Sequence, residues 1–306
     1  MAGGFVVCAA GVTQTRGTDL ASSQRVRSLQ SLSPRFQPPR TRKSLICELY
    51  ADDKSGRSVG GQTHFVQYGS KELEISLSFM MPKGRYVTVV LIGRSIDIAH
   101  PRENVRLMEE FLALPHVKRV LPGRLAFRRA CLCNPNMTVG SATNPYGHRV
   151  GVIGDMATSR LCKDGIYSAY LTATGLADSL IEVGIDRKSL KKSFLPVISR
   201  LCVDNRFGAI VFLFSRITFS RPTLSRWLYQ AVVTEIKTRP RGDRRLSDAL
   251  WRLASGDDSY RSILRSILHP ICIKRFLFGG VLATIRNILM ELFFGLKWKG
   301  LGRYPT

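Results

Sequence analysis

Hydrophobic and polar side chains alternate along the first part of the chain, which is the pattern of β-strands. Between Leu73 and Phe79 apolar residues alternate with Glu and Ser, so this strand is predicted to have one apolar face and one polar face. Residues 86–92 form a second, more uniformly apolar strand after a turn at Pro82 to Gly84. The region from Leu45 to about Gly93 is therefore predicted to be a β-sheet with one covered face.

Apolar residues recur at helical spacing in most of the remaining chain. Val105, Met108 and Phe111 predict a helix over residues 102–114. A second helix is predicted over residues 164–180, with an apolar stripe made of Ile166, Ala169, Tyr170, Ala173, Leu176, Ala177 and Leu180. Further helices are expected over residues 188–202, 207–219, 223–237, 245–254 and 260–268.

The beginning of the chain gives weaker signals. Residues 5–9 are apolar and predict a short buried strand, and residues 120–129 have a strand-like pattern. Residues 13–43 are polar, basic and rich in Ser and Pro, which predicts the least structured part of the chain. The predicted fold class is therefore α+β, with a mixed β-sheet and a helical C-terminal region.

The segment from Phe276 to Leu296 is strongly apolar but contains Arg286, Asn287 and Glu291. It is long enough to cross a bilayer, which takes roughly 20 residues, but two charges near its middle oppose a spanning position. We rank a core or domain-packing helix first, an interfacial membrane helix second and a true membrane span last.

The composition changes this picture mainly through charge. The chain has 306 residues, of which 44% are hydrophobic, so it can bury a core. Its 46 basic and 22 acidic side chains give a formal charge of +24, which favours anionic partners or simply makes a basic, solvated surface. The basic runs 35–43 and 239–245 hold almost no aromatic residues, so nucleic-acid binding is not predicted. Peripheral contact with an acidic membrane is compatible with the charge.

The seven cysteines are an odd number and form no CxxC pair. They predict neither a disulfide framework nor a zinc site, and a reducing compartment fits best. The first residues, MAGGFVVCAAGV, lack the basic start of a signal peptide. We therefore expect a cytoplasmic protein, with a peripheral position at a membrane as a further expectation.

One stretch, RVGVIGDMATSRLCKDGIYSAY, combines features that suit a phosphorylated ligand. An apolar strand ends at Gly154 and Asp155, and a helix follows a loop that ends in Lys163, Asp164 and Gly165. Ligands of α/β folds gather at the carboxyl ends of strands, and a helix N-terminus attracts phosphate. An aspartate placed there can accept hydrogen bonds from a chain of hydroxyl groups, and a glycine lets a ligand approach the backbone closely.

This stretch resembles the second flavin-binding motif of FAD-dependent oxidoreductases with the p-hydroxybenzoate hydroxylase fold. More narrowly, it is similar to the geranylgeranyl reductase-like branch, whose versions run GDAAxSRxxKDGIxSA. The resemblance implies that Asp155 binds the ribityl chain of FAD and that Gly165 and Ile166 lie beside the pyrophosphate and the isoalloxazine. The predicted cofactor-binding residues are Gly154, Asp155, Lys163, Asp164, Gly165, Ile166 and Ala169. The alternative is an ordinary strand–loop–helix with a tight turn.

Two more stretches agree with this resemblance in order and position. FVVCAAGV, residues 5–12, is similar to the middle motif of these proteins, although Ala10 stands where an acidic residue is common. MPKGRYVTVVLIG, residues 81–93, resembles the sheet of their substrate domain. No GxGxxG sequence follows an N-terminal strand. The FAD-binding fold is therefore expected to be truncated, and a partner chain is expected to supply the missing nucleotide-binding unit.

The predicted organisation has four parts. Residues 1–44 are a remnant of the FAD-binding domain with a basic loop, residues 45–130 a substrate-binding sheet, residues 131–185 the FAD-binding strand and helix, and residues 186–306 a helical region. The resemblance implies an FAD-dependent oxidoreductase, either a reductase or a monooxygenase, that acts on a prenyl or other lipophilic substrate. No catalytic side chain and no metal ligand is predicted, since the flavin carries the chemistry. The alternative is a non-catalytic basic protein that binds a membrane surface, or an inactive fragment of a flavoprotein.

Overall fold

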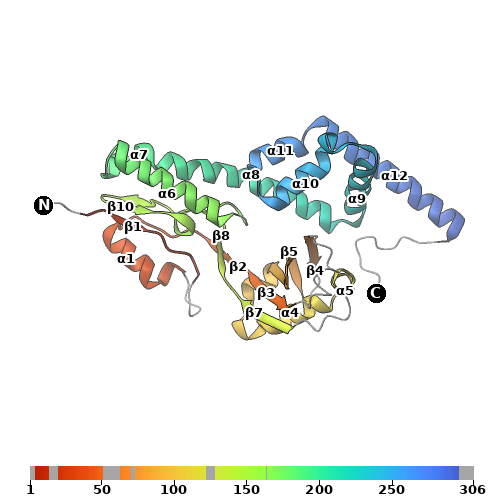
Figure 1. Ribbon diagram of the computed structural model, residues 1–306, viewed down its shortest axis with the longest axis horizontal. Helices are drawn as coiled ribbons and strands as arrows, with labels where there is room; N and C mark the ends of the chain where they lie inside the picture. The colour runs from red at the N-terminus through yellow and green to blue at the C-terminus, as the bar shows by residue number, and fades with distance from the viewer. Residues whose placement is uncertain are drawn as a thin grey trace. The chain divides into compact units, whose positions relative to one another are not determined.

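The computed structural model describes residues 4–13, 20–50, 63–69, 73–121, 128–162 and 164–295. The chain divides into two compact units, drawn in Figure 1. Unit 1 comprises residues 1–112 and 120–205, and unit 2 comprises residues 113–119 and 206–306. The division into four parts expected from the sequence stays a prediction.

One part of unit 1 is a small sheet between two layers of helix. Its strands, in the order β1-β10-β9, are β1 (Val6–Cys8), β10 (Val150–Val152) and β9 (Tyr146–Gly147). Strands β1 and β10 run parallel, and β9 and β10 form an antiparallel hairpin. Helix α1 (Gln24–Leu32) lies on one face, and α6 (Gly165–Glu182) and α7 (Arg187–Ser193) lie on the other (Figure 1). The core between these layers includes Phe36, Val150, Val152, Met156, Leu176, Leu190 and Phe194.

Two expectations for the start of the chain are wrong in part. Residues 24–32 form helix α1 after a short 3-10 turn, η1 (Leu20–Ser22), although this region was expected to be the least structured. The Ser23 side chain caps α1 by accepting from the N–H of Val26, and only two apolar residues of this polar helix are buried, which explains its weak signal. Strand β1 exists as predicted but is not buried, because Val6 and Val7 are 44% and 48% exposed.

A five-stranded antiparallel sheet makes up the other part of unit 1. Its order is β4-β5-β6-β3-β7, with bounds His64–Gly69, Glu74–Lys83, Tyr86–Ile92, Leu45–Tyr50 and Arg128–Cys133. The β3–β7 pair continues into the pair β2 (Thr41–Lys43) and β8 (Asn136–Thr138), and the N–H of Ser44 donates to the carbonyl of Pro135 at the junction. This long ribbon ends beside the small sheet, and both lie in unit 1.

A β-bulge in β5 changes which side chains face the core. Strand β4 pairs Val66 with Ser78 and Tyr68 with Ile75, so β5 carries one extra residue between these pairs. Before the bulge Leu73 and Ile75 are buried, as the alternating pattern predicts, but after it Ser78 and Met80 are buried while Leu77 and Phe79 are half-buried. The prediction of one continuous apolar face is therefore wrong, because an inserted residue inverts the alternation.

The helices that follow the sheet are α3 (Arg94–Ile98), the 3-10 turn η2 (Pro101–Glu103), α4 (Asn104–Ala113) and α5 (Pro115–Val120). Of these, only the one over residues 102–114 was predicted, and α3 and α5 were not. Leu107, Met108 and Phe111 form the buried face of α4, close to the predicted one. Most of the strand-like stretch at 120–129 lies outside the described residues, and strand β7 begins at Arg128.

Unit 2 is helical. Besides most of α5, its elements are the second half of α8 (Leu195–Ser220), α9 (Pro222–Thr238), the turn η4 (Arg241–Asp243), α10 (Arg245–Ser255), α11 (Tyr260–Ile267) and α12 (Pro270–Phe294). The polar residues 203–206 were expected to separate two helices, but α8 runs through them without a break.

Helices α9 and α12 pack closely because α12 carries two glycines at the contact. A Cβ atom on Gly279 would lie 2.6 Å from the backbone nitrogen of Ala231, so only glycine allows the two backbones this approach. The apolar segment therefore packs on a neighbouring helix, but it is no core helix. In its most apolar 18-residue window only 17% is buried, and by length and mean hydropathy of 1.5 the helix could cross a membrane.

A buried ion pair joins the elements of unit 2. The Glu235 carboxylate on α9 is almost fully buried and lies 2.6 Å from Nη1 of Arg275 on α12. It also accepts hydrogen bonds from the backbone N–H groups of Leu246 and Ser247 at the start of α10. Burial alone would raise the pKa of Glu235, but these hydrogen bonds and that from Arg275 bring it below the ordinary value of 4.5.

Replacing Glu235 with Gln is expected to reduce the free energy of unfolding of unit 2 by about 3 kcal/mol near neutral pH, because Arg275 loses its buried partner. A carboxyl with a lowered pKa stabilises the fold at pH values above 4.5, and this stability disappears as the pH falls through the lowered pKa. The difference between wild type and variant should therefore shrink below pH 4.5. Urea unfolding followed by tryptophan fluorescence measures it, since every tryptophan of the chain lies in residues 206–306. The exposed Glu291→Gln is the control, and an equal loss in both variants would contradict the assignment.

Candidate functional site

The site begins where strand β10 ends. Gly154 follows the strand and adopts a φ of +65°, a conformation that favours glycine. Its N–H donates to Oγ1 of Thr172 in the middle of α6 at 2.9 Å. Its missing side chain faces α6 as well, because a Cβ atom there would lie 3.6 Å from the Cβ of Ala169. The strand end and the helix are therefore held together at this glycine.

Asp155 lies in the short 3-10 turn η3 (Gly154–Met156). Its backbone carbonyl accepts from the hydroxyl of Thr138 at 2.8 Å, which fixes the backbone of the turn to β8. Its carboxylate points toward the start of α6, since a Cβ atom on Gly165 would lie 3.4 Å from Oδ1 of Asp155. Within the described residues this half-buried carboxylate accepts no hydrogen bond from the protein.

Helix α6 starts with a capped first turn. Asp164 is the N-cap in the left-handed conformation (φ 53°, ψ 45°), and its side chain accepts from the N–H of Tyr167. The N–H groups of Gly165 and Ile166 have no acceptor within the helix. Because the first turn of a helix carries positive partial charge, an anionic ligand group beside Gly165 would be stabilised there.

The face of α6 that packs on the loop is polar, which differs from the predicted apolar stripe. The buried residues of the helix are Ser168, Thr172, Leu176 and Ser179, and of these only Leu176 belongs to the stripe. Ile166 is 90% exposed, and Tyr170 and Ala177 are also exposed. Small hydroxyl side chains occupy this face because they form hydrogen bonds with the loop backbone. The Oγ of Ser168 accepts from the N–H of Arg160 at 3.0 Å.

Two glycines let the layers approach around the site. A Cβ atom on Gly151 of β10 would lie 2.6 Å from a methyl carbon of Leu176. On the other side of α6, a Cβ atom on Gly175 would lie 2.7 Å from a methyl carbon of Val197 on α8. Helix α6 is therefore clamped between the strand that carries Gly154 and a second helix, so its first turn has a defined position relative to Asp155.

Residues distant in sequence anchor the loop between η3 and α6. The side-chain amide of Asn205 on α8 donates to the carbonyl of Ser159 and accepts from the N–H of Leu161, both at 2.8 Å. The buried Arg160 guanidinium lies between Asp164 at 3.5 Å and Asp204 at 3.8 Å. Sequence reasoning missed all of these roles. Arg160 could have been noticed within the resembling motif, whereas no local signal marks Asp204 or Asn205.

The structure thus brings together most of the predicted cofactor-binding set. Gly154, Asp155 and Ala169 meet at the end of β10, and Asp164, Gly165 and Ile166 form the adjoining helix start. Lys163 lies outside the described residues. In the same described part of the chain no group of three His, Cys, Asp or Glu residues could hold a metal ion.

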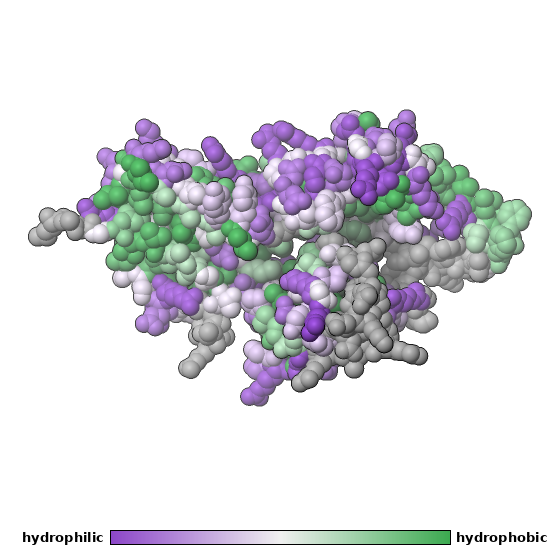
Figure 2. All heavy atoms as spheres, viewed as in Figure 1, coloured by the Kyte–Doolittle hydropathy of each residue, from purple (hydrophilic) through white to green (hydrophobic). Residues whose placement is uncertain are grey.

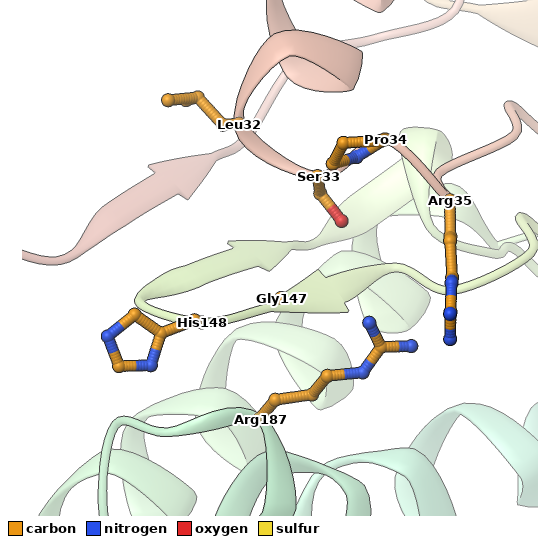
Figure 3. A pocket seen from close by; sticks show the side chains of 7 residues that line it. All are labelled: Leu32, Ser33, Pro34, Arg35, Gly147, His148 and Arg187. Carbon is orange, nitrogen blue, oxygen red and sulfur yellow. The ribbon is translucent and has the colours of Figure 1, made fainter.

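A pocket of about 450 Å³ lies at the other end of the small sheet (Figure 3). It is lined by Leu32, Ser33, Pro34, Arg35, Gly147, His148 and Arg187. Gly147 and His148 belong to the β9–β10 turn, which precedes β10, whereas Gly154 follows it. The pocket is therefore separate from the turn that carries Asp155.

No protein-family model and no curated protein matches the sequence. Among solved structures, a geranylgeranyl bacteriochlorophyll reductase-like protein from Thermoplasma acidophilum is 15% identical, with a TM-score of 0.51 over 90% of this chain and 62% of that one. The flavin-dependent halogenase CmlS is 14% identical, with a TM-score of 0.47 over 94% of this chain and 50% of that one. A flavoprotein/dehydrogenase from Cytophaga hutchinsonii is 12% identical, with a TM-score of 0.46 over 87% of this chain and 60% of that one.

The chain spans between 50% and 62% of the length of these three structures. At such identities the likeness concerns the fold alone. The likeness to the reductase-like protein, with its TM-score of 0.51, therefore shows that this chain has a similar fold.

Proposed function

We propose that the protein is an FAD-dependent oxidoreductase, either a reductase or a monooxygenase, that acts on a prenyl or other lipophilic small molecule. The observation that carries the proposal is the Asp155 carboxylate, which faces the first residue of α6 and has no protein donor within the described residues. A half-buried carboxylate of this kind needs hydrogen-bond donors. The hydroxyl groups of a ribityl chain are suitable donors.

The residues around Asp155 fit one half of FAD. Asp155 would hold the ribityl hydroxyls, and the first turn of α6 at Gly165 and Ile166 would face the pyrophosphate. The three atoms nearest to a Cβ on Gly165 are side-chain oxygens of Asp155 and Ser159, at 3.4 to 3.9 Å, so polar groups surround the position where the ligand would approach the backbone. A bound flavin supplies the electron transfer, while this chain supplies binding and orientation. The described residues offer no comparable group for the adenine half.

We propose that a nucleotide-binding unit on a partner chain completes the site. Among the described residues strand β1 pairs only with β10, and its Val6 and Val7 are about half exposed. The nearby α6 presents Ile166 and Tyr170 to solvent. An edge strand with unpaired backbone groups and apolar side chains is suited to pairing with a further strand. Covering these surfaces would also remove an exposed apolar patch.

The substrate class rests on the resemblance to geranylgeranyl reductase-like proteins, and the five-stranded sheet is the part that we assign to substrate binding. We place the protein in the cytoplasm, because all seven cysteines are free, as in a reducing compartment.

A peripheral membrane contact through α12 fits a lipophilic substrate. Leu277, Val281, Ile285, Ile288 and Leu292 are all about half exposed or more. Figure 2 shows the outer end of this helix as hydrophobic surface. Lys and Arg greatly outnumber Asp and Glu in residues 206–306, which favours an anionic lipid surface. The same observations support the alternative function, a basic membrane-surface protein without catalysis.

Asp155→Asn is expected to weaken flavin binding about tenfold, because the variant loses the charge that strengthens hydrogen bonds to ligand hydroxyls. Flavin fluorescence quenching and visible absorbance of the purified chain measure this with FAD and with FMN. We expect FMN to bind the chain as well, only more weakly than FAD, since both carry the ribityl chain for Asp155 but only FAD has the pyrophosphate that the first turn of α6 would face.

The control for this experiment is Asp178→Asn, an exposed aspartate on α6, which should bind flavin like the wild type. Equal affinities in the two variants would contradict the role of Asp155. A wild-type chain that binds neither flavin is then fused to a nucleotide-binding unit that carries the GxGxxG sequence. Failure of this fusion to bind FAD would refute the proposed site.

Asn205→Ala is expected to lower both flavin affinity and the order of the loop before α6, because Ser159 and Leu161 lose their anchor. Removal of two such buried hydrogen bonds costs about 2 kcal/mol. Hydrogen exchange at the Leu161 amide should be faster than in the wild type. Asn205→Asp keeps the acceptor for this amide and should retain its protection, and unchanged exchange in Asn205→Ala would show that the anchor is unimportant.

Ile288→Glu is expected to reduce cosedimentation of the protein with vesicles of phosphatidylserine and phosphatidylcholine several-fold, because a charge enters the apolar face of α12. Pure phosphatidylcholine vesicles should bind less wild-type protein, since the basic charge then has no counterpart. Ile181→Glu makes the same change at an exposed position of α6 and is the control. Wild-type protein that stays in the supernatant with both vesicles rules out the membrane contact.

A further inference from the structure

The pocket at the turn of the β9–β10 hairpin is formed by three segments of unit 1 (Figure 3). The end of α1 contributes residues 32–35, the hairpin contributes Gly147 and His148, and α7 contributes its first residue, Arg187. The hairpin turn precedes β10, and Asp155 follows it. Nothing in the proposed flavin site therefore accounts for the side chains gathered here.

Ser33 is a buried residue whose hydroxyl has no hydrogen-bond partner among the described residues. Ser33 is 6% exposed, and its Oγ forms no hydrogen bond with any of the residues that the structure describes. It lies close to the hairpin backbone, since a Cβ atom on Gly147 would be 3.1 Å from it. In Figure 3 it points from the end of α1 into the pocket. The hydroxyl is therefore free to donate a hydrogen bond to a ligand inside the pocket.

Two guanidinium groups face the same space. In Figure 3 the side chains of Arg35 and Arg187 extend from opposite sides of the pocket and point toward each other, while the His148 ring points away from them. Neither arginine forms an ion pair in the described part of the chain, and no acidic residue lines the pocket. Two like charges that converge without a counterion repel each other, and an anion between them would remove this repulsion.

The acidic residue next to Arg187 in sequence is occupied elsewhere. Asp186 is the N-cap of α7, and its carboxylate accepts from the backbone N–H groups of Lys188 and Ser189 and from the hydroxyl of Ser189. These bonds hold the pKa of Asp186 below its ordinary value, with the Ser189 hydroxyl as the largest cause. Asp186 therefore acts as a helix cap and is already supplied with donors.

We propose that this pocket binds the phosphate group of a small molecule. Two guanidinium forks and a hydroxyl donor match the several oxygens of a phosphate, which arginine recognises with paired hydrogen bonds. The volume of about 450 Å³ lies within the range of small-molecule sites, about 300–1,000 Å³, and leaves room for an organic group beside the phosphate. The proposal is independent of flavin binding.

Equilibrium dialysis with radiolabelled inorganic phosphate and with glycerol 3-phosphate tests the site at constant ionic strength. We expect saturable binding of both, with the ester tighter because it fills more of the pocket. Arg35→Ala and Arg187→Ala should each weaken binding about tenfold, and Ser33→Ala should weaken it less. Phosphate that binds while the ester does not would assign the free ion as the ligand of the same anion site.

Two controls separate the pocket from the overall basic charge. Arg27→Ala removes an exposed arginine of α1 outside the pocket and lowers the net charge equally, so it should leave the affinity unchanged. Arg35→Lys keeps the charge but loses the fork, and it should bind more weakly than the wild type. Binding that does not saturate, or that falls equally in Arg27→Ala and Arg35→Ala, would overturn the proposal.

Discussion

The hydrogen bond from the N–H of Gly154 to the hydroxyl of Thr172 joins the end of β10 to the middle of α6. With the bond from the Arg160 N–H to Ser168, it turns the polar face of the helix toward the strand–loop junction. The consequence is that the first turn of α6 lies beside the Asp155 carboxylate. The same constraint sends most of the apolar side chains of α6 outward, because a helix can present only one face to the loop.

The outward apolar surfaces of unit 1 follow from this arrangement. Strand β1 lacks a neighbour on one side within the described residues, and Ile166 lies exposed at the start of the helix that packs over the same sheet. Apolar surface of this kind is costly in water unless another element covers it. The partner unit that we propose for the cofactor site would therefore also cover these side chains. In unit 2 the apolar helix α12 is also largely exposed, independently of the surfaces of unit 1.

The small sheet carries different chemistry at its two ends. The carboxyl end of β10 leads to an acidic group beside a helix N-terminus, which suits a ligand with hydroxyls followed by phosphate. The hairpin end gathers two arginines and the Ser33 hydroxyl, which suits an anion alone. The chain has a large excess of basic residues, yet in this pocket the charge is focused by the convergence of α1, the hairpin and α7. Local geometry, more than the total charge, distinguishes the pocket from the rest of the basic surface.

The sequence by itself determined the features that depend on neighbouring residues: the strand–turn–helix around Gly154, the start of α6 near Asp164, the β5–β6 hairpin and most helices. These follow from periodicity, turn residues and capping, which act over a few positions. Only the tertiary structure decided which face of α6 is buried, where the bulge in β5 inverts the alternation, and that Asn205 anchors a loop 44 residues away. Those outcomes depend on hydrogen bonds and packing between distant segments. On α6, therefore, Tyr170 is exposed and Thr172 is buried, which is the reverse of what hydrophobicity alone predicts.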